Sequence, residues 1–275
     1  MKDIICVYHA NCADGFTAAW SLWKALGDKV EYIPGFYGMT PPDVTDKTLY
    51  VVDFSFKRPV MEELVKKARF VVHIDHHASA IKDMEGFYAA NLETFYSPKN
   101  DQSGAMLTWN YFFPEDDVPN IVKYVDDVDR WKFLLPNSKE IAANLFSYDY
   151  TFENWEFVAN QPIEQQVAEG KAIQRRLEKD CRELAQVVVR RMNIGGHNVP
   201  VANVPKQFGS YLASDLAVGE PFAAYYYDTN QREFGLRSTP EGLDVSVIAA
   251  MYGGGGHRNA SGFKVDYKRA EDFEV

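Results

Sequence analysis

The feature that most constrains the fold is a series of short apolar runs in the first third of the chain, none of which alternates with polar residues. Strands that are covered on both faces have this pattern, because both faces must then be apolar. Segments with helical spacing separate the runs, one from Phe16 to Leu26 and one that Pro59 can open. This βαβαβ order predicts an α/β fold with a largely parallel sheet. The expected strands are Ile4 to His9, Val30 to Ile33, Leu49 to Asp53 and Phe70 to Asp75.

The remainder of the sequence predicts helices followed by a second, smaller unit. Helical spacing runs from Gly104 to Leu135, whereas the aromatic stretch from Asn137 to Phe157 matches no element. Apolar residues between Ile173 and Val188 recur every three or four positions, which predicts a long amphipathic helix ending at Gly195-Gly196. We therefore expect an N-terminal domain over residues 1–158, a connector helix over 159–195 and a smaller α/β domain with a glycine-rich loop over 196–275.

The composition restricts the expected cellular compartment and the expected classes of binding partner. The 275 residues include only three cysteines, too few for a disulfide framework, and no run approaches the roughly 20 apolar residues that span a bilayer. These properties predict a cytoplasmic protein with no membrane partner. A formal net charge of -10 disfavours long duplex nucleic acid, which binds proteins through basic faces. A small anionic substrate, held by local cations or metal ions, fits better.

Acidic and imidazole side chains follow the expected parallel strands. His9, Asp53 and the trio Asp75-His76-His77 each stand at a strand's C-terminal end, and Asp14 lies in the loop after the first strand. Ligands of open α/β sheets bind at this edge. Such a nitrogen and oxygen set suits Mn²⁺, Mg²⁺ or Zn²⁺. For Asp53 alone, a helix N-cap is an equally good interpretation.

The adjacent histidines need separate roles, because neighbours on a strand point to opposite faces. At a strand-to-helix turn, His76 could be a metal ligand while His77 faces the substrate as a phosphate donor or general acid. Asp75 could hold one imidazole in the required tautomer. His73, which lies within the strand, is better explained as a buried structural histidine.

A second concentration of unusual residues is the run from Tyr252 to Phe263, which contains four successive glycines followed by His257 and Arg258. Glycines at this density indicate a loop whose backbone is closely approached, and free backbone N–H groups can bind a phosphate. There is no Gly-Lys-Ser/Thr, so an ATP-binding P-loop is not indicated. A flexible surface turn is the alternative.

These motifs, in this order, resemble the DHH phosphoesterase superfamily. The resemblance rests on His-Ala-Asn-Cys-Ala-Asp-Gly around His9, Val-Val-Asp around Asp53, Ile-Asp-His-His ending at His77, and the terminal Gly-Gly-Gly-His. It covers nearly the whole chain. More narrowly, the sequence is similar to the branch with a DHH-associated C-terminal domain, which includes oligoribonucleases, single-strand exonucleases and cyclic-dinucleotide phosphodiesterases.

The resemblance implies roles for the N-terminal residues. His9 would serve one divalent cation, Asp14 and His76 would serve a second, and Asp53 would bridge the two. The expected cofactor is Mn²⁺, as two ions, with Mg²⁺ or another divalent cation as the alternative. A fourth motif is an aspartate after a helix. It is best matched by Asp127, with Asp129 as the alternative and Asp126 as a cap or a solvated charge.

In the C-terminal domain the resemblance implies substrate contacts. Arg237 and Ser238 would bind a substrate phosphate, a task for which a guanidinium is suited. The loop of Gly254, Gly255, Gly256 and His257 would contact a terminal phosphate or a base. One departure stands out: Cys12 takes the place of an aspartate that is common in the first motif, so Cys12 is a further candidate ligand and occupancy of the His9 site is in question.

The function that we expect is metal-dependent hydrolysis of short single-stranded oligonucleotides to mononucleotides, with His77 and Asp75 in the catalytic group. A cyclic-dinucleotide phosphodiesterase or a nucleotide bisphosphate phosphatase on the same scaffold is the first alternative. A nucleotide-binding protein with weakened catalysis is the second. The oligomeric state stays open, a homodimer included.

Overall fold

The computed structural model describes residues 2–266. The chain divides into two compact units, Met1–Gln174 and Arg175–Val275, which are described separately. The C-terminal end of the expected second domain, residues 267–275, lies outside the described residues. Within the described range, no helix is long and apolar enough to cross a membrane.

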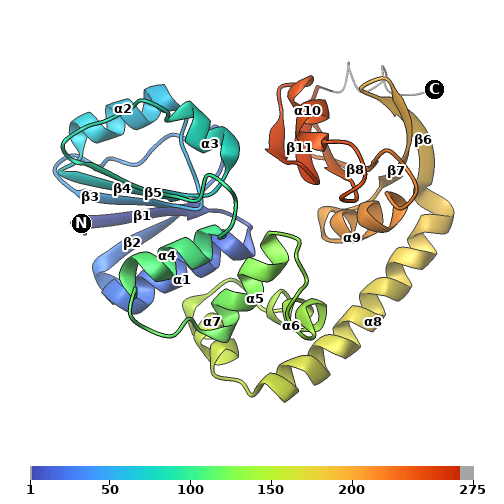
Figure 1. Ribbon diagram of the computed structural model, residues 1–275, viewed down its shortest axis with the longest axis horizontal. Helices are drawn as coiled ribbons and strands as arrows, with labels where there is room; N and C mark the ends of the chain where they lie inside the picture. Colours follow the sequence, from blue (N-terminus) through green and yellow to red (C-terminus); the bar gives the residue numbers. More distant parts are fainter. Residues whose placement is uncertain (1, 267–275) are drawn as a thin grey trace. The chain divides into compact units, whose positions relative to one another are not determined.

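A parallel five-stranded sheet forms the centre of the first unit, in the order β2-β1-β3-β4-β5. The predicted α/β fold is confirmed. Helices α2 (Arg58–Lys67) and α3 (Ala78–Asp83) lie on one face of the sheet, and α1 (Ala13–Leu26) and α4 (Gly104–Phe112) lie on the other (Figure 1). A short 3₁₀ helix, η1 (Gly27–Lys29), follows α1. The strands are β1 (Ile4–His9), β2 (Val30–Gly35), β3 (Thr48–Val52), β4 (Phe70–Asp75) and β5 (Leu92–Tyr96).

The helical part of this unit differs from the sequence prediction. The single helical stretch expected from Gly104 to Leu135 is two helices, α4 and α5 (Asn120–Asp129), with Pro114 and Pro119 in the connection between them. Proline lacks the N–H that a continuous helix needs. The unassigned aromatic stretch forms α6 (Ser138–Leu145) and α7 (Phe152–Ala159).

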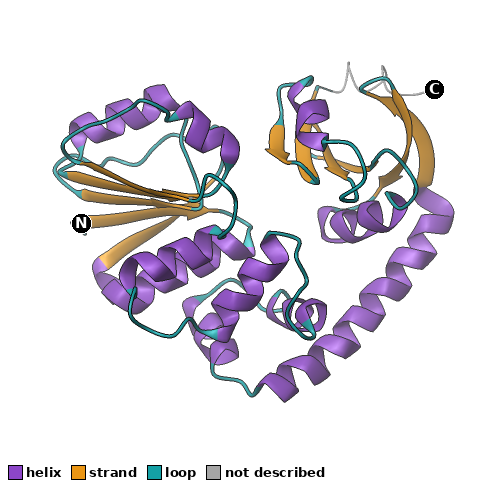
Figure 2. Ribbon diagram, in the orientation of Figure 1, coloured by secondary structure: helices purple, strands orange, loops and turns teal. Residues whose placement is uncertain are grey.

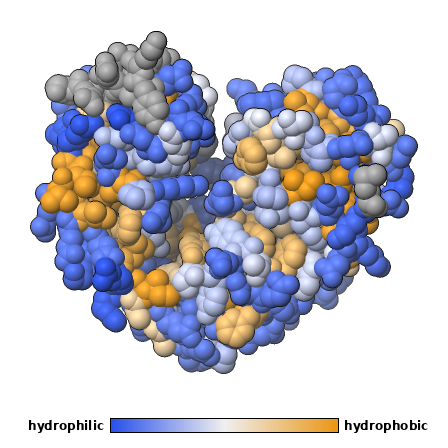
Figure 3. Space-filling model, turned by 180° about the vertical axis from the view of Figure 1, so that it is seen from behind, coloured by the Kyte–Doolittle hydropathy of each residue, from blue (hydrophilic) through white to orange (hydrophobic). Residues whose placement is uncertain are grey.

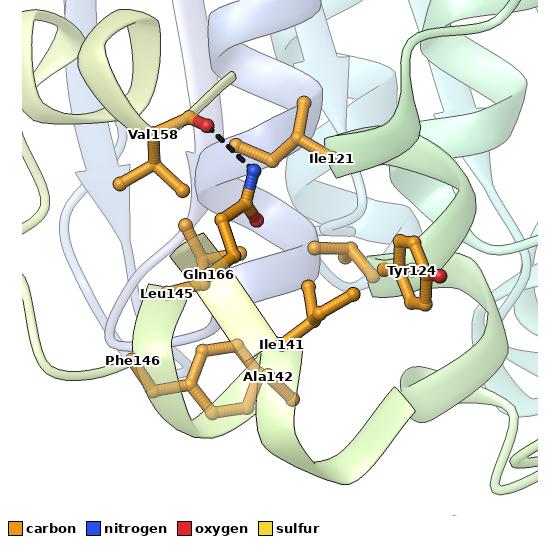
Figure 4. A pocket seen from close by; sticks show the side chains of 9 residues that line it. Ile121, Tyr124, Ile141, Ala142, Leu145, Phe146, Val158 and Gln166 are labelled. Atoms are coloured by element: carbon orange, nitrogen blue, oxygen red, sulfur yellow. Dashed lines mark hydrogen bonds between the residues drawn. The ribbon is translucent and has the colours of Figure 1, made fainter. Parts of the chain in front are cut away.

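The first turns of the long helix α8 (Ile163–Val188) pack against these helices. Gln166 donates a hydrogen bond from Nε2 to the carbonyl of Val158 beside a small apolar cavity that α5 and α6 also line (Figure 4). The cavity measures about 10 Å³, at the limit for one water molecule. It therefore belongs to the core and is no substrate site.

The expected connector helix over 159–195 is shorter in the structure. Helix α8 ends at Val188, and Val189–Ile194 forms strand β6, which pairs with β7 (His197–Asn203) in an antiparallel hairpin. Gly195 and Gly196 have φ of 59° and 83°, the left-handed backbone that a two-residue hairpin turn requires. The two glycines thus connect two strands rather than end a helix. The β-branched Val187-Val188-Val189 run favours the change to strand.

The second unit contains a mixed six-stranded sheet in the order β10-β11-β9-β8-β7-β6 (Figure 2). In β8 (Ala223–Asp228), alternate residues pack into different cores: Ala224 and Tyr226 with α10 (Val245–Ala250), Ala223 and Tyr225 with α9 (Lys206–Leu216). Both faces of the sheet are therefore covered. The remaining strands are β9 (Arg232–Arg237), β10 (Gly255–His257) and β11 (Ala260–Val265).

Candidate metal centre

The predicted strand-end residues meet at the C-terminal edge of the parallel sheet. His9 ends β1, Asp53 follows β3, and Asp75 ends β4 directly before His76. The backbone of Asp53 has φ of 51°, an uncommon left-handed conformation that aspartate tolerates better than most residues. Backbone strain of this kind is typical of functional sites and turns this carboxylate away from the strand direction.

Three carboxylates surround one nitrogen of His76. Its Nε2 atom lies 3.2 Å from Oδ1 of Asp53, 3.5 Å from Oδ2 of Asp14 and 3.6 Å from Oδ2 of Asp129. Two ligands that each bind one ion at about 2.1 to 2.2 Å lie roughly 3.0 to 3.6 Å apart. The donor atoms of Asp14, Asp53 and His76 are therefore spaced like ligands around a single divalent cation, and Asp129 faces the same imidazole nitrogen.

A second group of donors uses the other oxygen of Asp53. Nδ1 of His9 lies 3.6 Å from Oδ2 of Asp53, and the donor atoms of His9, Asp53 and His77 lie close enough to hold one ion. Asp14, Asp53 and His76 form the corresponding first group. Asp53 is the member common to both, as expected of a bridging carboxylate.

The surroundings of the Asp53 carboxylate are those expected of a cation ligand. Its side chain is 1% exposed, and neither carboxylate oxygen has a hydrogen-bond partner in the described structure. A buried, unpaired carboxylate is costly unless a positive charge compensates it. Burial raises the pKa of Asp53, but interactions with His76 and His9 outweigh this and hold its pKa well below the usual value.

Burial and the neighbouring carboxylates raise the pKa of Asp14 and of Asp129. Divalent cations would favour the ionised form of both carboxylates.

Two polar residues fix the orientation of the imidazoles. Nδ1 of His76 lies 2.7 Å from Oδ1 of Asn100, an acceptor, so Nδ1 donates this hydrogen bond and Nε2 faces the carboxylates. Oδ1 of Asp75 accepts hydrogen bonds from the backbone N–H of His76 and from both the backbone N–H and Nδ1 of His77. Asp75 is thus a positioning residue. Asn100 was missed at the sequence level because the strand before it was not predicted.

The N-terminus of α4 completes the site. Asp14 accepts hydrogen bonds from the backbone N–H groups of Gly104 and Ala105 at 2.7 and 2.9 Å. A Cβ atom at Gly104 would lie 2.4 Å from Cβ of Asp53, so only glycine permits this approach. Asp14 therefore joins a helix terminus to the candidate metal group.

The three carboxylates near the end of α5, Asp126, Asp127 and Asp129, make different contacts. Asp127 does not lie with the metal group: it accepts hydrogen bonds from Leu134 N, Leu135 N and the Ser138 hydroxyl. Asp129, the alternative, faces His76 and keeps Oδ2 buried without a hydrogen-bond partner. We therefore replace Asp127 by Asp129 in the proposed ligand set. Asp126 accepts from Ser103 N and pairs with Arg130, a structural role.

Cys12 and His73 lie near the site without belonging to either donor group. Cys12 is the N-cap residue of α1, and its thiol makes no capping hydrogen bond. Burial and the carboxylates of Asp53, Asp129 and Asp14 raise the pKa of this thiol well above its usual value, which disfavours a thiolate ligand. His73 is fully buried and lies 3.1 Å from the Phe54 carbonyl and 2.7 Å from the Tyr96 hydroxyl, the structural role predicted for it.

In the second unit, Arg237 ends β9 and donates to the Ser210 hydroxyl and to the carbonyl of Leu236. None of the described carboxylates lies within ion-pair distance of it, and burial lowers its pKa. Ser238 is buried, and its hydroxyl accepts a hydrogen bond from Asn259 at 3.0 Å. Of these two candidates, Arg237 is the one whose charge a substrate phosphate would compensate.

The glycine run is not a simple loop. Gly253 and Gly254 follow α10, while Gly255, Gly256 and His257 form β10 against β11. A Cβ atom at Gly254 would lie 2.1 Å from the carbonyl oxygen of Gly262, so packing alone explains this glycine. Gly255 is exposed, its φ is not positive, and a Cβ there would contact nothing within 4 Å. The fold gives no reason for glycine at position 255.

No family model matches. The chain is 29% identical to the uncharacterized protein R106 of Acanthamoeba polyphaga mimivirus over 290 residues, covering 94% of this chain and 66% of that protein. It is 24% identical to oligoribonuclease NrnB of Bacillus subtilis over 230 residues, covering 74% of this chain and 55% of NrnB. The chain thus spans less than two thirds of the length of both relatives.

Solved structures share the fold. RecJ of Thermus thermophilus, solved with Mn²⁺, superimposes with a TM-score of 0.55 and 15% identity over 98% of this chain and 50% of RecJ. The pGpG-specific phosphodiesterase PggH of Vibrio cholerae gives a TM-score of 0.50 and 14% identity over 98% of this chain and 95% of PggH. At these identities the likeness shows a shared fold. Within the site, the run Asp75-His76-His77 divides into a positioning carboxylate and two candidate donors.

Proposed function

We propose that this protein is a metal-dependent phosphodiesterase that hydrolyses short oligonucleotides to mononucleotides. The observation that carries the proposal is Asp53, a buried carboxylate at the junction of two donor groups, whose two oxygens each face an imidazole and have no described hydrogen-bond partner. Two-metal phosphoesterases need a shared ligand of this kind. The similarity to oligoribonuclease NrnB and the net charge of -10 support a short substrate.

Each side chain then has a defined task. His9, Asp14, Asp53, His76 and Asp129 would hold two divalent cations, Mn²⁺ first. Such cations supply a nucleophile from water near neutral pH and offset the charge of the phosphoryl oxygens. His77, held through Nδ1 by Asp75, would donate a hydrogen bond to a phosphoryl oxygen or a proton to the leaving oxygen.

In the second unit, we propose that Arg237 and the segment Gly254–His257 bind the remainder of the substrate. Arg237 supports this because its guanidinium has no described carboxylate partner. Gly255 supports it because its missing side chain leaves open space. Replacing Arg237 by alanine should chiefly raise KM for a dinucleotide and affect a minimal activated phosphodiester less.

The test is a substrate panel with Mn²⁺: a labelled linear dinucleotide, a cyclic dinucleotide and a 3',5'-bisphosphate. Fastest release of 5'-mononucleotides from the linear dinucleotide supports the proposal. Preference for either other substrate would replace it by a cyclic-dinucleotide phosphodiesterase or a nucleotide bisphosphate phosphatase. Binding without turnover of any substrate would leave a nucleotide-binding protein.

Asp53→Asn should abolish this turnover, and Asp46→Asn is the matched control. Asp46 has nearly the same left-handed backbone, with φ of 59°, but it is exposed and precedes β3 at the opposite edge of the sheet. Equal loss in both variants would indicate a general effect on the fold instead of loss of a shared ligand.

A further inference from the structure

Groups of exposed large apolar side chains can mark surfaces that bind other molecules. On the face shown in Figure 3, apolar residues form separate groups within a mainly hydrophilic surface. Two adjacent aromatic residues of the first unit are exposed: Phe36 at 60% and Tyr37 at 62%. They directly follow β2 at the edge of the sheet that carries the candidate metal centre.

Tyr37 is placed beside the donor groups. Its ring centroid lies 6.0 Å from that of His9 and 5.4 Å from that of Phe54. Phe54 is 1% exposed and follows Asp53 directly, so it provides a fixed support for the Tyr37 ring. One side of Tyr37 thus packs on site residues while most of its surface stays open to solvent.

Backbone hydrogen bonds hold this turn in position. Ala10 N donates to the carbonyl of Gly35 at 2.8 Å, which joins the end of β2 to the residue after His9. Met39 N donates to the carbonyl of Phe36 at 3.1 Å and closes a turn around Tyr37. An aromatic ring fixed in this way can bind a flat partner with little loss of side-chain entropy.

The charges around Tyr37 indicate which kind of group its ring would bind. The nearby carboxylates of Asp53 and Asp75 disfavour a further anionic group, whereas a nucleobase is uncharged and planar. Bases stack on aromatic side chains without regard to sequence. We propose that the Tyr37 ring is the stacking platform for one nucleobase of the substrate, at the His9 end of the metal centre. This inference rests on the proposed function, since it names the group that lies next to the bound phosphodiester.

The experiment compares a 5'-phosphorylated diadenosine dinucleotide with two analogues, each of which lacks one base. We would measure kcat/KM with Mn²⁺ for the wild type, Tyr37→Ala, Tyr37→Phe and Phe36→Ala. Phe36→Ala is the matched control, because Phe36 lies in the same turn with the same exposure but makes no described ring contact with His9.

Stacking contributes about 1 to 3 kcal/mol per base, which corresponds to roughly 5- to 150-fold in binding. Tyr37→Ala should therefore lose at least fivefold more kcat/KM on the complete dinucleotide than on one of the analogues, mainly through KM. Tyr37→Phe should retain the preference for the base. Equal losses on all three substrates, no loss, or an equal effect of Phe36→Ala would overturn the proposal.

A binding measurement separates this inference from the proposed function. If the wild type turns over none of the substrates, the phosphodiesterase assignment fails, and the affinities of the dinucleotide and its analogues still test the platform. A weaker affinity of Tyr37→Ala for the complete dinucleotide alone supports stacking. The same affinity for all three ligands in the wild type refutes it. Size-exclusion chromatography of both alanine variants is included, because a change in oligomeric state would assign the aromatic pair to a contact between copies instead.

Discussion

Nε2 of His76 lies 3.2 Å from Oδ1 of Asp53, although the two residues follow different strands and neither oxygen of Asp53 has a described hydrogen-bond partner. Adjacent parallel strands bring their C-terminal ends to one edge, so β3 and β4 deliver the two side chains to the same point. The close approach of a buried imidazole and an unpaired carboxylate is the arrangement that a shared cation would stabilise.

The first prediction concerns Asp53→Asn, which keeps the shape of the side chain and removes its charge. A saturating cation, at about 100 times its dissociation constant, stabilises the native state by about 2.7 kcal/mol. The melting temperature of the wild type should therefore rise by roughly 5 to 10 °C on addition of Mn²⁺. The variant should lose this rise while its circular dichroism spectrum stays unchanged. A full rise in the variant would remove Asp53 from the metal centre.

The second prediction compares Asp129→Asn with Asp127→Asn. Burial and the charge of Asp53 raise the pKa of Asp129, so above that pKa its charge opposes folding. Asp129→Asn should weaken Mn²⁺ binding and be at least as stable as the wild type in chelator at pH 7.5. Asp127→Asn should retain Mn²⁺ binding and lose about 1 to 3 kcal/mol, because its amide cannot accept all the present hydrogen bonds. Metal titrations and chemical denaturation check both variants, and reversed results would restore Asp127 as the ligand.

The third prediction concerns Asn100, which holds the tautomer of His76. Losing such an outer partner costs roughly 10- to 100-fold in metal affinity. Asn100→Ala should show this loss, whereas Asn100→Asp keeps an acceptor for Nδ1–H of His76 and should retain most of the affinity. Calorimetric titration with Mn²⁺ measures both. Equal losses in the two variants would mean that the hydrogen bond does not orient the imidazole.

The fourth prediction uses two neighbouring glycines of the second unit. Gly255→Ala meets no atom within 4 Å, so its melting temperature should match that of the wild type while KM for a dinucleotide rises. Gly254→Ala should unfold at a lower temperature, because its Cβ would lie 2.1 Å from a backbone oxygen. An unchanged KM in Gly255→Ala would show that substrate does not approach this backbone.

Much of the fold was predictable because the buried strands carry a strong signal. β1 and β4 have the expected limits, since apolar runs with sharp polar ends define them. β5 was not predicted: it lies at the edge of the sheet and most of its residues are at least partly exposed, so its pattern is weak. The glycine pair at 195–196 resembles the end of a helix, so the sequence places β6 in the preceding helix, although Met192 and Ile194 are spaced two residues apart as in a strand.

The site residues that stand at the ends of strands could be predicted from the sequence. The carboxylate at the end of helix α5 could not be chosen from the sequence alone. His9, Asp53 and His76 are placed by the sheet itself. Asp127 and Asp129 share one helical turn, and only the rotation of α5 against the sheet decides which carboxylate faces His76. That rotation depends on tertiary packing, which single-sequence patterns do not contain. Asn100 acts from a loop, where no periodicity identifies it.

Strand β6 has a consequence for how copies of this protein meet. It forms one border of the second sheet, and its residues Arg190, Arg191 and Asn193 are exposed. An unpaired strand border is an open template for sheet extension, and charged side chains along it discourage that association. The hairpin that shortens α8 thus gives the described sheet a polar margin, with Arg191 paired to Glu220, and such a margin disfavours strand addition at this border.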